Sequence, residues 1–270
     1  MNKIVVGSIV YNEEHRFLEK YLSNIQKYAN EIVLIDDGST DNSLKMCKEV
    51  TKNVFKTNRL FIENEVELRD ALWCKCSELC NNGDFILIQD CDEFLHNDSI
   101  EHLKSEIDKC LYLDGDAIAW KLYDMWNDHQ YREDIYWTAH RRWWVHMVRY
   151  NNKIKYMWKN TKLHCGRIPL NSYYNAFPSQ LQILHMGYSR EDLRQEKYNF
   201  YINVDKNGEN GILSQYKSII DNTPNLVNFV SNYTEKTLYV SKYRITLKSK
   251  IISSLNGYFT NIKIRIIIVG

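Results

Sequence analysis

The chain lacks any marked excess of charge of one sign. Its 35 Lys and Arg residues nearly balance 34 Asp and Glu residues, which leaves a formal net charge of +1. Because the basic residues are dispersed among acidic ones, the sequence has no stripe for a phosphate backbone and predicts no nucleic-acid partner. Only 3 prolines occur. This scarcity, beside many Lys, Asn, Ile and Tyr residues, suggests an AT-rich microbial genome.

Long apolar runs are also missing. No run approaches the ~20 residues of a membrane-spanning helix. The apolar run at residues 4–10 is too short for a signal peptide and leads into a predicted strand. The 7 cysteines are scattered, and Cys74, Cys76 and Cys80 lack the spacing and the second ligand pair of a zinc site. Free thiols fit a reducing cytosol, so we expect a cytoplasmic protein.

What the chain does have is a set of apolar runs that end in polar residues. Residues 4–11 and 31–35 are typical of buried strands, and residues 12–28 between them show helical spacing, with Asn12 as the expected N-cap. This order predicts a βαβ unit and a parallel sheet. A third run, residues 85–88, is followed by acidic residues. Because ligands bind outside the carboxyl ends of parallel strands, we expect the three polar segments to share one rim.

The acidic residues after the third run indicate a cation site. Unpaired carboxylates are costly to bury, and Asp90 and Asp92 would point the same way if the chain stayed extended. Mg²⁺ and Mn²⁺ take oxygen ligands from carboxylates and from nucleotide phosphates. The alternative is a solvated acidic turn that binds nothing.

Three motifs, taken in order, resemble those of family 2 glycosyltransferases. They are residues 8–14 (SIVYNEE), 34–41 (LIDDGSTD) and 83–93 (GDFILIQDCDE). The similarity is close over roughly the first hundred residues and weaker from Ala117 to Tyr201. It implies an α/β fold of the GT-A type, which is a Rossmann-like, mostly parallel sheet flanked by helices. It also implies inverting transfer of a sugar from a nucleotide-sugar, with Mn²⁺ or Mg²⁺ as cofactor.

The resemblance implies a nucleotide-binding role for several residues. Tyr11 and Glu14 would flank the nucleoside base, Tyr11 by stacking on it. Either Asp36 or Asp37 would form a hydrogen bond with the base or the ribose. Arg69 would approach the diphosphate, because a guanidinium matches the geometry of phosphate oxygens; its alternative is a solvated position on a helix.

The resemblance also implies the metal ligands. Asp90 would lie near the ribose and the metal, and Asp92 would ligate the metal directly. His185, which follows a late apolar run, would be a further ligand, since imidazole joins carboxylates and phosphate oxygens in Mn²⁺ sites. His164 is a weaker rival, and the alternative for either histidine is a purely structural role.

Inverting transfer needs a general base that deprotonates the acceptor hydroxyl as it attacks. Asp134 is the first predicted base, Glu133 the second and Asp128 the third, because family members often place the base in an acidic pair. The alternative is a surface ion pair of these carboxylates with Arg132 or Arg141.

Two later segments have alternative interpretations. The aromatic residues from 123 to 144 either bind sugar rings or form a hydrophobic core under a long loop. Residues 189–204 are predicted to be a helix capped by Ser189. On that helix, Lys197 and Arg194 either reach the diphosphate or lie on a solvated face.

The sequence predicts a GT-A domain over residues 1–205 and a helical extension over residues 206–270. We expect transfer from a UDP-sugar to a glycan, lipid-linked or protein acceptor. The basic and apolar tail, residues 248–270, would contact the inner membrane surface, pack on the domain or form a homodimer contact. One alternative is a sugar-nucleotide nucleotidyltransferase, which would need a glycine-rich loop where residues 11–14 are acidic. The other is a non-catalytic protein that binds nucleotides or glycans.

Overall fold

The protein is built around one mixed β-sheet. The computed structural model describes residues 2–58, 60–161, 164–209, 211–231 and 233, so the tail at residues 248–270 and its predicted contacts lie outside the described residues. Eight strands form the sheet in the order β3-β2-β1-β4-β8-β6-β9-β5. These strands are β1 (Ile4–Val10), β2 (Glu31–Asp36), β3 (Val54–Lys56), β4 (Phe85–Ile88), β5 (Glu93–Leu95), β6 (Ala117–Asp124), β8 (Trp144–Arg149) and β9 (Ala176–His185).

The sheet confirms the predicted α/β class. Strands β3, β2, β1 and β4 run parallel to one another, and so do β6 and β9. Strand β8 is antiparallel to β4 and β6, and β5 is antiparallel to β9. Because β2, β1 and β4 are adjacent, the three polar segments that follow them do lie at one rim of the sheet. This arrangement was predicted from the order of apolar runs and is the basis of the site.

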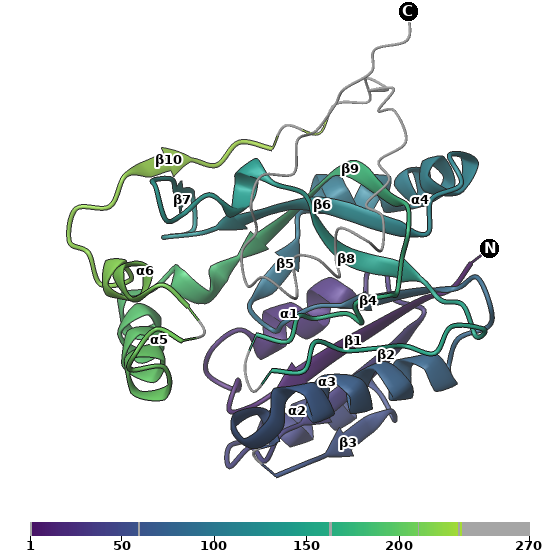
Figure 1. Ribbon diagram of the computed structural model, residues 1–270, viewed down its shortest axis with the longest axis horizontal. Coiled ribbons are helices and arrows are strands. Elements are labelled where there is room, and N and C mark those ends of the chain that lie inside the picture. Colours follow the sequence, from purple (N-terminus) through teal and green to yellow (C-terminus); the bar gives the residue numbers. More distant parts are fainter. Residues whose placement is uncertain (1, 59, 162–163, 210, 232, 234–270) are drawn as a thin grey trace, which may run out of the picture.

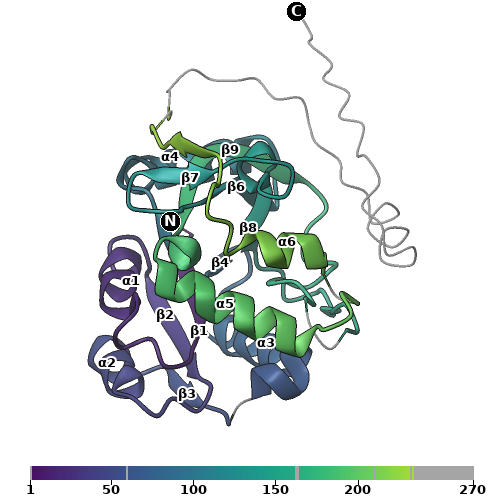
Figure 2. The ribbon, with the colours of Figure 1, turned by 90° about the vertical axis from the view of Figure 1, so that its left-hand side faces the viewer.

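Helices cover both faces of the sheet because alternate side chains of each strand point to opposite faces. Val6 and Leu87 pack with α1 (Leu18–Ile25), α2 (Ser43–Val50) and α4 (Asn97–Tyr112) in one core. Val5 and Ile86 pack with α3 (Leu60–Glu78) in the other. Figure 2 shows α1 and α2 together on one side and α3 on the other.

Several predicted element boundaries were wrong. Asn12 does not cap a helix, because residues 12–16 form a loop and α1 begins only at Leu18. The helix α5 (Glu191–Val204) begins after Arg190, and no side chain caps it, so Ser189 is not the cap. The physical reason is the same in both places. The preceding polar residues bond to other loops or turns instead of to the first turn of the helix.

The predicted extension is not purely helical. Its described part holds α6 (Leu213–Ser218) and a strand, β10 (Leu226–Asn228), which pairs antiparallel with β7 (Gln130–Arg132). The prediction of a helical extension was therefore wrong for residues 226–228, because the edge of β7 offers backbone partners that a local pattern does not reveal. In Figures 1 and 2, α5 and α6 lie beside the carboxyl ends of β1 and β4.

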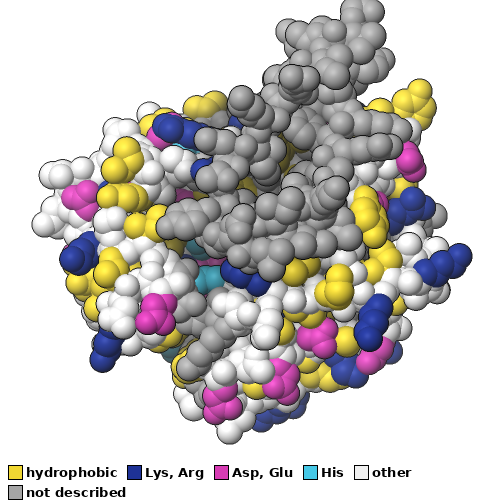
Figure 3. All heavy atoms as spheres, viewed as in Figure 1, with side chains coloured by type: hydrophobic (Ala, Val, Ile, Leu, Met, Phe, Trp, Pro, Cys, Tyr) yellow, Lys and Arg dark blue, Asp and Glu magenta, His cyan; other side chains and the backbone are white. Residues whose placement is uncertain are grey.

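The surface carries mixed charge. On the described part of the face drawn in Figure 3, Lys and Arg side chains alternate with Asp and Glu side chains. A search of the described helices for one that is long and apolar enough to cross a bilayer finds none.

Close packing between β1 and α3 generates a stability prediction. A Cβ atom on Gly7 would lie 2.5 Å from Cys76 Sγ and 2.9 Å from Ile88 Cδ1. We expect Gly7→Ala to lower the free energy of unfolding by about 1–3 kcal/mol, because overpacking forces neighbouring atoms apart. Urea denaturation measures the loss, and adding Cys76→Ala should recover part of it. An unchanged urea midpoint for Gly7→Ala would contradict the packing argument.

Candidate functional site

A rigid corner forms where the loop after β1 meets the loop after β2. The backbone N–H groups of residues 12, 13 and 14 donate to Ser39 Oγ, Ser43 Oγ and Asp41 Oδ2, at 3.0, 2.8 and 3.1 Å. In return, the side-chain oxygen of Asn12 accepts a hydrogen bond of 2.8 Å from the Thr40 N–H. Asn12 has a φ of 50°, a left-handed conformation that Asn adopts more readily than most residues. The two motifs therefore form one preorganised unit.

The two aspartates at the end of β2 have different environments. Asp37 accepts hydrogen bonds from Thr57 Oγ1, Leu60 N and Phe61 N, at 2.8, 2.7 and 3.1 Å, and so caps the start of α3. Asp36 is fully buried, yet its Oδ1 atom has no hydrogen-bond partner among the described residues. A buried carboxylate oxygen without a partner costs free energy, so a ligand group that donates to it is expected there. Of the two, Asp36 fits the predicted nucleotide role better.

Tyr11 and Glu14 lie at the same corner. Tyr11 directly follows β1 and is partly buried. Both carboxylate oxygens of Glu14 accept hydrogen bonds from Asn42, from its N–H at 2.9 Å and from its side-chain amide at 2.6 Å. Glu14 thus fixes the loop before α2, and its contact with a nucleoside base stays a prediction.

Asp90 belongs to a network of buried and partly buried ions that includes two arginines. Arg69 Nη1 lies 3.1 Å from Asp90 Oδ1 and its Nε lies 3.4 Å from Glu65 Oε1. Arg167 lies 3.9 Å from Asp90 and forms a bidentate pair with Glu93 at 2.6 and 2.8 Å. Burial opposes ionisation, but the two guanidinium groups outweigh it and lower the pKa of Asp90. Arg69 is therefore part of the site and does not lie on a solvated helix face.

Asp92 belongs to a second group on the other side of the turn. Its Oδ2 atom lies 3.0 Å from Lys197 Nζ and 3.4 Å from His185 Nε2. The other ring nitrogen of His185 is 2.7 Å from Asp124 Oδ1. Burial by itself would lower the pKa of His185, but the carboxylate of Asp92 outweighs it and the pKa rises to about 10. Despite burial, Lys197 and His185 hold the pKa of Asp92 well below its usual value.

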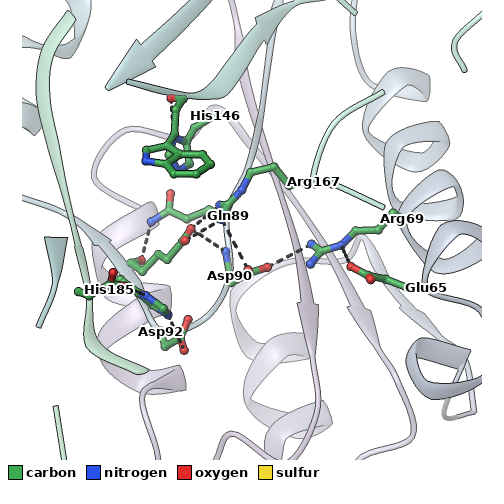
Figure 4. Close-up of polar contacts among 12 residues, drawn as sticks. Glu65, Arg69, Gln89, Asp90, Asp92, His146, Arg167 and His185 are labelled. Atoms are coloured by element: carbon green, nitrogen blue, oxygen red, sulfur yellow. Dashed lines mark hydrogen bonds and ion pairs between the residues drawn. The ribbon is translucent and has the colours of Figure 1, made fainter. Parts of the chain in front are cut away.

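The two aspartates of the acidic motif point in different directions. Figure 4 shows Asp90 directed towards Arg69 and Asp92 directed towards His185. The prediction that they point the same way was wrong, because β4 ends at Ile88 and residues 91 and 92 form a turn. A pair of metal ligands made of Asp90 and Asp92 is therefore not preformed.

The group around Asp92 fits a divalent cation only in part. Asp92 and His185 are close enough to bind one ion at the ~2.1 Å typical of such ligand bonds. Asp124 orients the imidazole, as carboxylates commonly do in metal sites. Among the described residues, however, no group of three or more His, Cys, Asp or Glu could hold an ion. Lys197 also competes for Asp92. Further ligands would have to come from a bound phosphate or water.

Gly187 allows the ammonium group of Lys197 to reach Asp92. Any Cβ atom at this position would collide with the Lys197 ammonium, the Asp92 carboxylate and the His185 ring. The helix α5 carries Lys197 across the rim, where its Nζ also lies 4.5 Å from the ring centre of Tyr188. Of the two alternatives for Lys197, the solvated face was wrong. Arg194 instead donates to the carbonyl oxygens of Trp126 and Tyr188.

The predicted catalytic carboxylates lie elsewhere. Asp134 accepts from Arg132 Nε at 2.6 Å and from the N–H groups of Tyr136 and Trp137, at 2.9 and 3.3 Å. Glu133 pairs with Arg141 through its Oε1 atom. These are the ion pairs that the sequence offered as the alternative. No described contact joins either carboxylate to Asp92, so the structure does not favour them as the base, and that role stays a prediction.

Sequence reasoning missed several members of the site. Arg167 and Glu65 carried no motif, because Arg167 lies in an irregular segment and Glu65 on a helix of mixed polarity. The sequence did contain a signal for Asp124, because this acidic residue ends an apolar strand, as the acidic residues of the three motifs do. The glycine at position 187, two residues after His185, was a second signal, because glycine often occurs where other atoms approach the backbone closely.

The comparisons with known proteins agree with the motifs. A model of glycosyl transferase family 2 matches residues 6–170. The chain is 36% identical over 111 residues to the glycosyltransferase GlyA of Streptococcus pneumoniae serotype 4, a match that spans 39% of this chain and 15% of that relative.

Similar solved structures include TarS from S. aureus. The structure of TarS residues 1–349 is 15% identical, covers 82% of this chain and 69% of that chain, and gives a TM-score of 0.43. The structure of TarS residues 1–349 in complex with UDP is 14% identical to this chain. The match covers 81% of this chain and 69% of that chain, with a TM-score of 0.45.

Glu13, at the edge of the site, generates a prediction about pH. Burial raises its pKa from 4.5 to about 7; Arg16 opposes the rise, and Asp92 adds to it. The folded protein thus holds this proton more tightly than the unfolded chain, so stability falls as pH rises from 4.5 to about 7 and then levels off. We expect Glu13→Gln to raise the free energy of unfolding by about 2 kcal/mol at pH 8 and to change it little at pH 5.

Urea denaturation at the two pH values measures this difference. Glu19→Gln, on an exposed part of α1, is the control and should show no difference between the two pH values. Equal effects of Glu13→Gln at both pH values would mean that the carboxylate is not held protonated by the fold.

Proposed function

The chain belongs to glycosyl transferase family 2, and on that premise we propose that it transfers a sugar from a nucleoside diphosphate donor, with inversion. The predicted nucleotide is UDP, and the acceptor is a glycan, a lipid-linked molecule or a protein. The observation that carries the proposal is the convergence at one rim of the corner around Asp36 and the ion groups around Asp90 and Asp92.

The nucleoside end of the donor is assigned to the corner between β1 and β2. The unpartnered Asp36 Oδ1 atom would accept a hydrogen bond from an N–H of the base, and Tyr11 would stack on the ring. Asp36 and Tyr11 lie next to two loops that hydrogen bonds already join. Little conformational entropy is therefore lost when the nucleotide binds.

The diphosphate is assigned to the cationic groups next to that corner. Arg69 and Arg167 are both held in place by carboxylates, and Lys197 approaches from α5. We propose that Asp92 and His185 hold Mn²⁺ or Mg²⁺ together with diphosphate oxygens. When bound, the ion neutralises charge on the leaving diphosphate. Lys197 would then release Asp92 and pair with the diphosphate.

The acceptor hydroxyl attacks the anomeric carbon while the bond from that carbon to the diphosphate breaks. Its proton passes to a carboxylate or imidazole on the side opposite the diphosphate. Asp134 and Glu133 remain the predicted bases, but Asp134 would first have to give up its ion pair with Arg132.

Titration calorimetry with nucleoside diphosphates tests the donor assignment. We expect UDP to bind more tightly than GDP, ADP or CDP, and Mn²⁺ to strengthen its binding. Asp36→Asn should weaken UDP binding by roughly 10-fold to 100-fold, because removal of a buried hydrogen-bond acceptor costs about 1–3 kcal/mol. Asp108→Asn, an exposed site on α4, is the control. Absence of binding by every diphosphate, with no UDP released from a UDP-sugar, would refute the proposal.

The Asp92 group generates a second prediction, about the metal alone. Lys197→Met should tighten Mn²⁺ binding in the absence of a donor by roughly 10-fold, because Asp92 loses its competing ammonium. Asp124→Asn should weaken it by 10–100-fold, since the orienting carboxylate is lost. Electron paramagnetic resonance of free Mn²⁺ measures both constants.

Lys20→Met, at an exposed position on α1, is the matched control and should leave the affinity unchanged. If Lys197→Met weakened Mn²⁺ binding, or if Asp124→Asn had no effect, the metal would not lie between Asp92 and His185.

A further inference from the structure

A cavity of about 240 Å³ opens beside the Asp92 group, and its lining is mostly aromatic. Its lining comes from α5, α6, the segment after β7 and the segment before α5, and Figure 2 shows α5 and α6 close together. The lining residues that matter here are Trp137, Tyr188, Tyr201, Tyr216, His164 and Gln215.

The cavity adjoins the reacting centre. Tyr188 forms part of its wall, and the ring of Tyr188 lies 5.2 Å from the ring of His185 and 4.5 Å from Lys197 Nζ. Tyr188 therefore belongs both to the wall of the cavity and to the surroundings of the Asp92 group. A molecule in the cavity would lie next to the residues to which the diphosphate is assigned.

The lining determines which ligand fits. Among the residues that the structure describes, the lining contains no Lys, Arg, Asp or Glu, which disfavours a strongly charged ligand. Aromatic rings such as those of Trp137 and Tyr188 suit apolar C–H patches, and the amide of Gln215 supplies a polar group, as is typical of small-molecule sites. The volume exceeds the about 150 Å³ of an engineered cavity that binds benzene, so it admits a substituted six-membered ring.

His164 at the edge of the cavity is held in an unusual conformation. Its φ is 58°, a left-handed value that costs a non-glycine residue about 1 kcal/mol or more. Its backbone N–H donates to Glu65 Oε2 at 2.7 Å, and the other oxygen of Glu65 pairs with Arg69. The carboxylate that steadies a predicted diphosphate-binding arginine therefore also positions an imidazole at the cavity.

We propose that this cavity binds a neutral hexose ring of the acceptor, with its attacking hydroxyl directed towards the Asp92 group. The proposal rests on the proposed function and specifies its acceptor as a neutral glycoside. The donor's own sugar is the alternative occupant, and the experiment below distinguishes the two.

The test compares two tryptophan variants of α6. Gln215→Trp places a large ring in the cavity, whereas Lys217→Trp makes the same change at an exposed position two residues further on. The probes are the methyl β-glycosides of glucose, galactose and N-acetylglucosamine, with methyl β-glucuronide as the charged comparison. Saturation-transfer NMR measures their binding, and calorimetry measures the binding of UDP and of a UDP-sugar.

We expect at least one neutral glycoside to bind the wild type and Lys217→Trp, more tightly than the glucuronide does. Gln215→Trp should weaken that binding at least 10-fold and leave UDP binding unchanged. Equal glycoside binding by Gln215→Trp and the wild type would overturn the proposal, as would a wild type that binds UDP but no neutral glycoside.

Two further outcomes separate the alternatives. If Gln215→Trp weakened the binding of the UDP-sugar but not of UDP, and left glycoside binding intact, the cavity would hold the donor's sugar and the acceptor proposal would fall. If neither the wild type nor any variant bound a nucleotide, the proposed function would be refuted. The glycoside measurements would still show whether the cavity binds a neutral sugar.

Discussion

The site depends on the cost of burying carboxylates. Asp90 and Asp92 follow a strand in the middle of the sheet, where charges without partners would destabilise the fold. Cationic side chains from distant parts of the chain pair with these carboxylates and offset the cost. Arg69 comes from α3, Arg167 from an irregular segment and Lys197 from α5. Holding these charges together draws α3, α5 and the loops to the rim, and a polyanion bound there could share the same cations.

Adjacent acids of the same type have acquired different roles. Asp37 caps α3, whereas Asp36 keeps a buried oxygen without a partner. Asp90 binds guanidinium groups, whereas Asp92 contacts Lys197 and His185. In the first pair, one carboxylate stabilises the scaffold and the other keeps an oxygen without a partner among the described residues. In the second pair, each carboxylate is paired with cations from different parts of the chain.

The second half of the chain completes the site. Strand β9 carries His185 to the rim beside β6, which brings Asp124 within 2.7 Å of the imidazole. The 3₁₀ turn after β9 contains Gly187, and its lack of a side chain lets α5 approach. Helices α5 and α6 then enclose the aromatic cavity. The part of the chain with the weakest sequence motifs thus supplies the histidine, the lysine and most walls of the aromatic cavity.

The sequence by itself determined the α/β class, the adjacency of three strand ends and the identity of the acids gathered there, because burial patterns and chain order constrain both. The resemblance to family 2 glycosyltransferases also pointed to His185, which the structure places beside Asp92; its role as a metal ligand stays a prediction. Only the tertiary structure decided which of Asp36 and Asp37 stays unpartnered, that Asp90 and Asp92 point apart, and that Lys197 contacts Asp92. These outcomes depend on turn geometry and on charges brought together from residues as far apart as Asp92 and Lys197, and such pairings leave no local pattern in the chain.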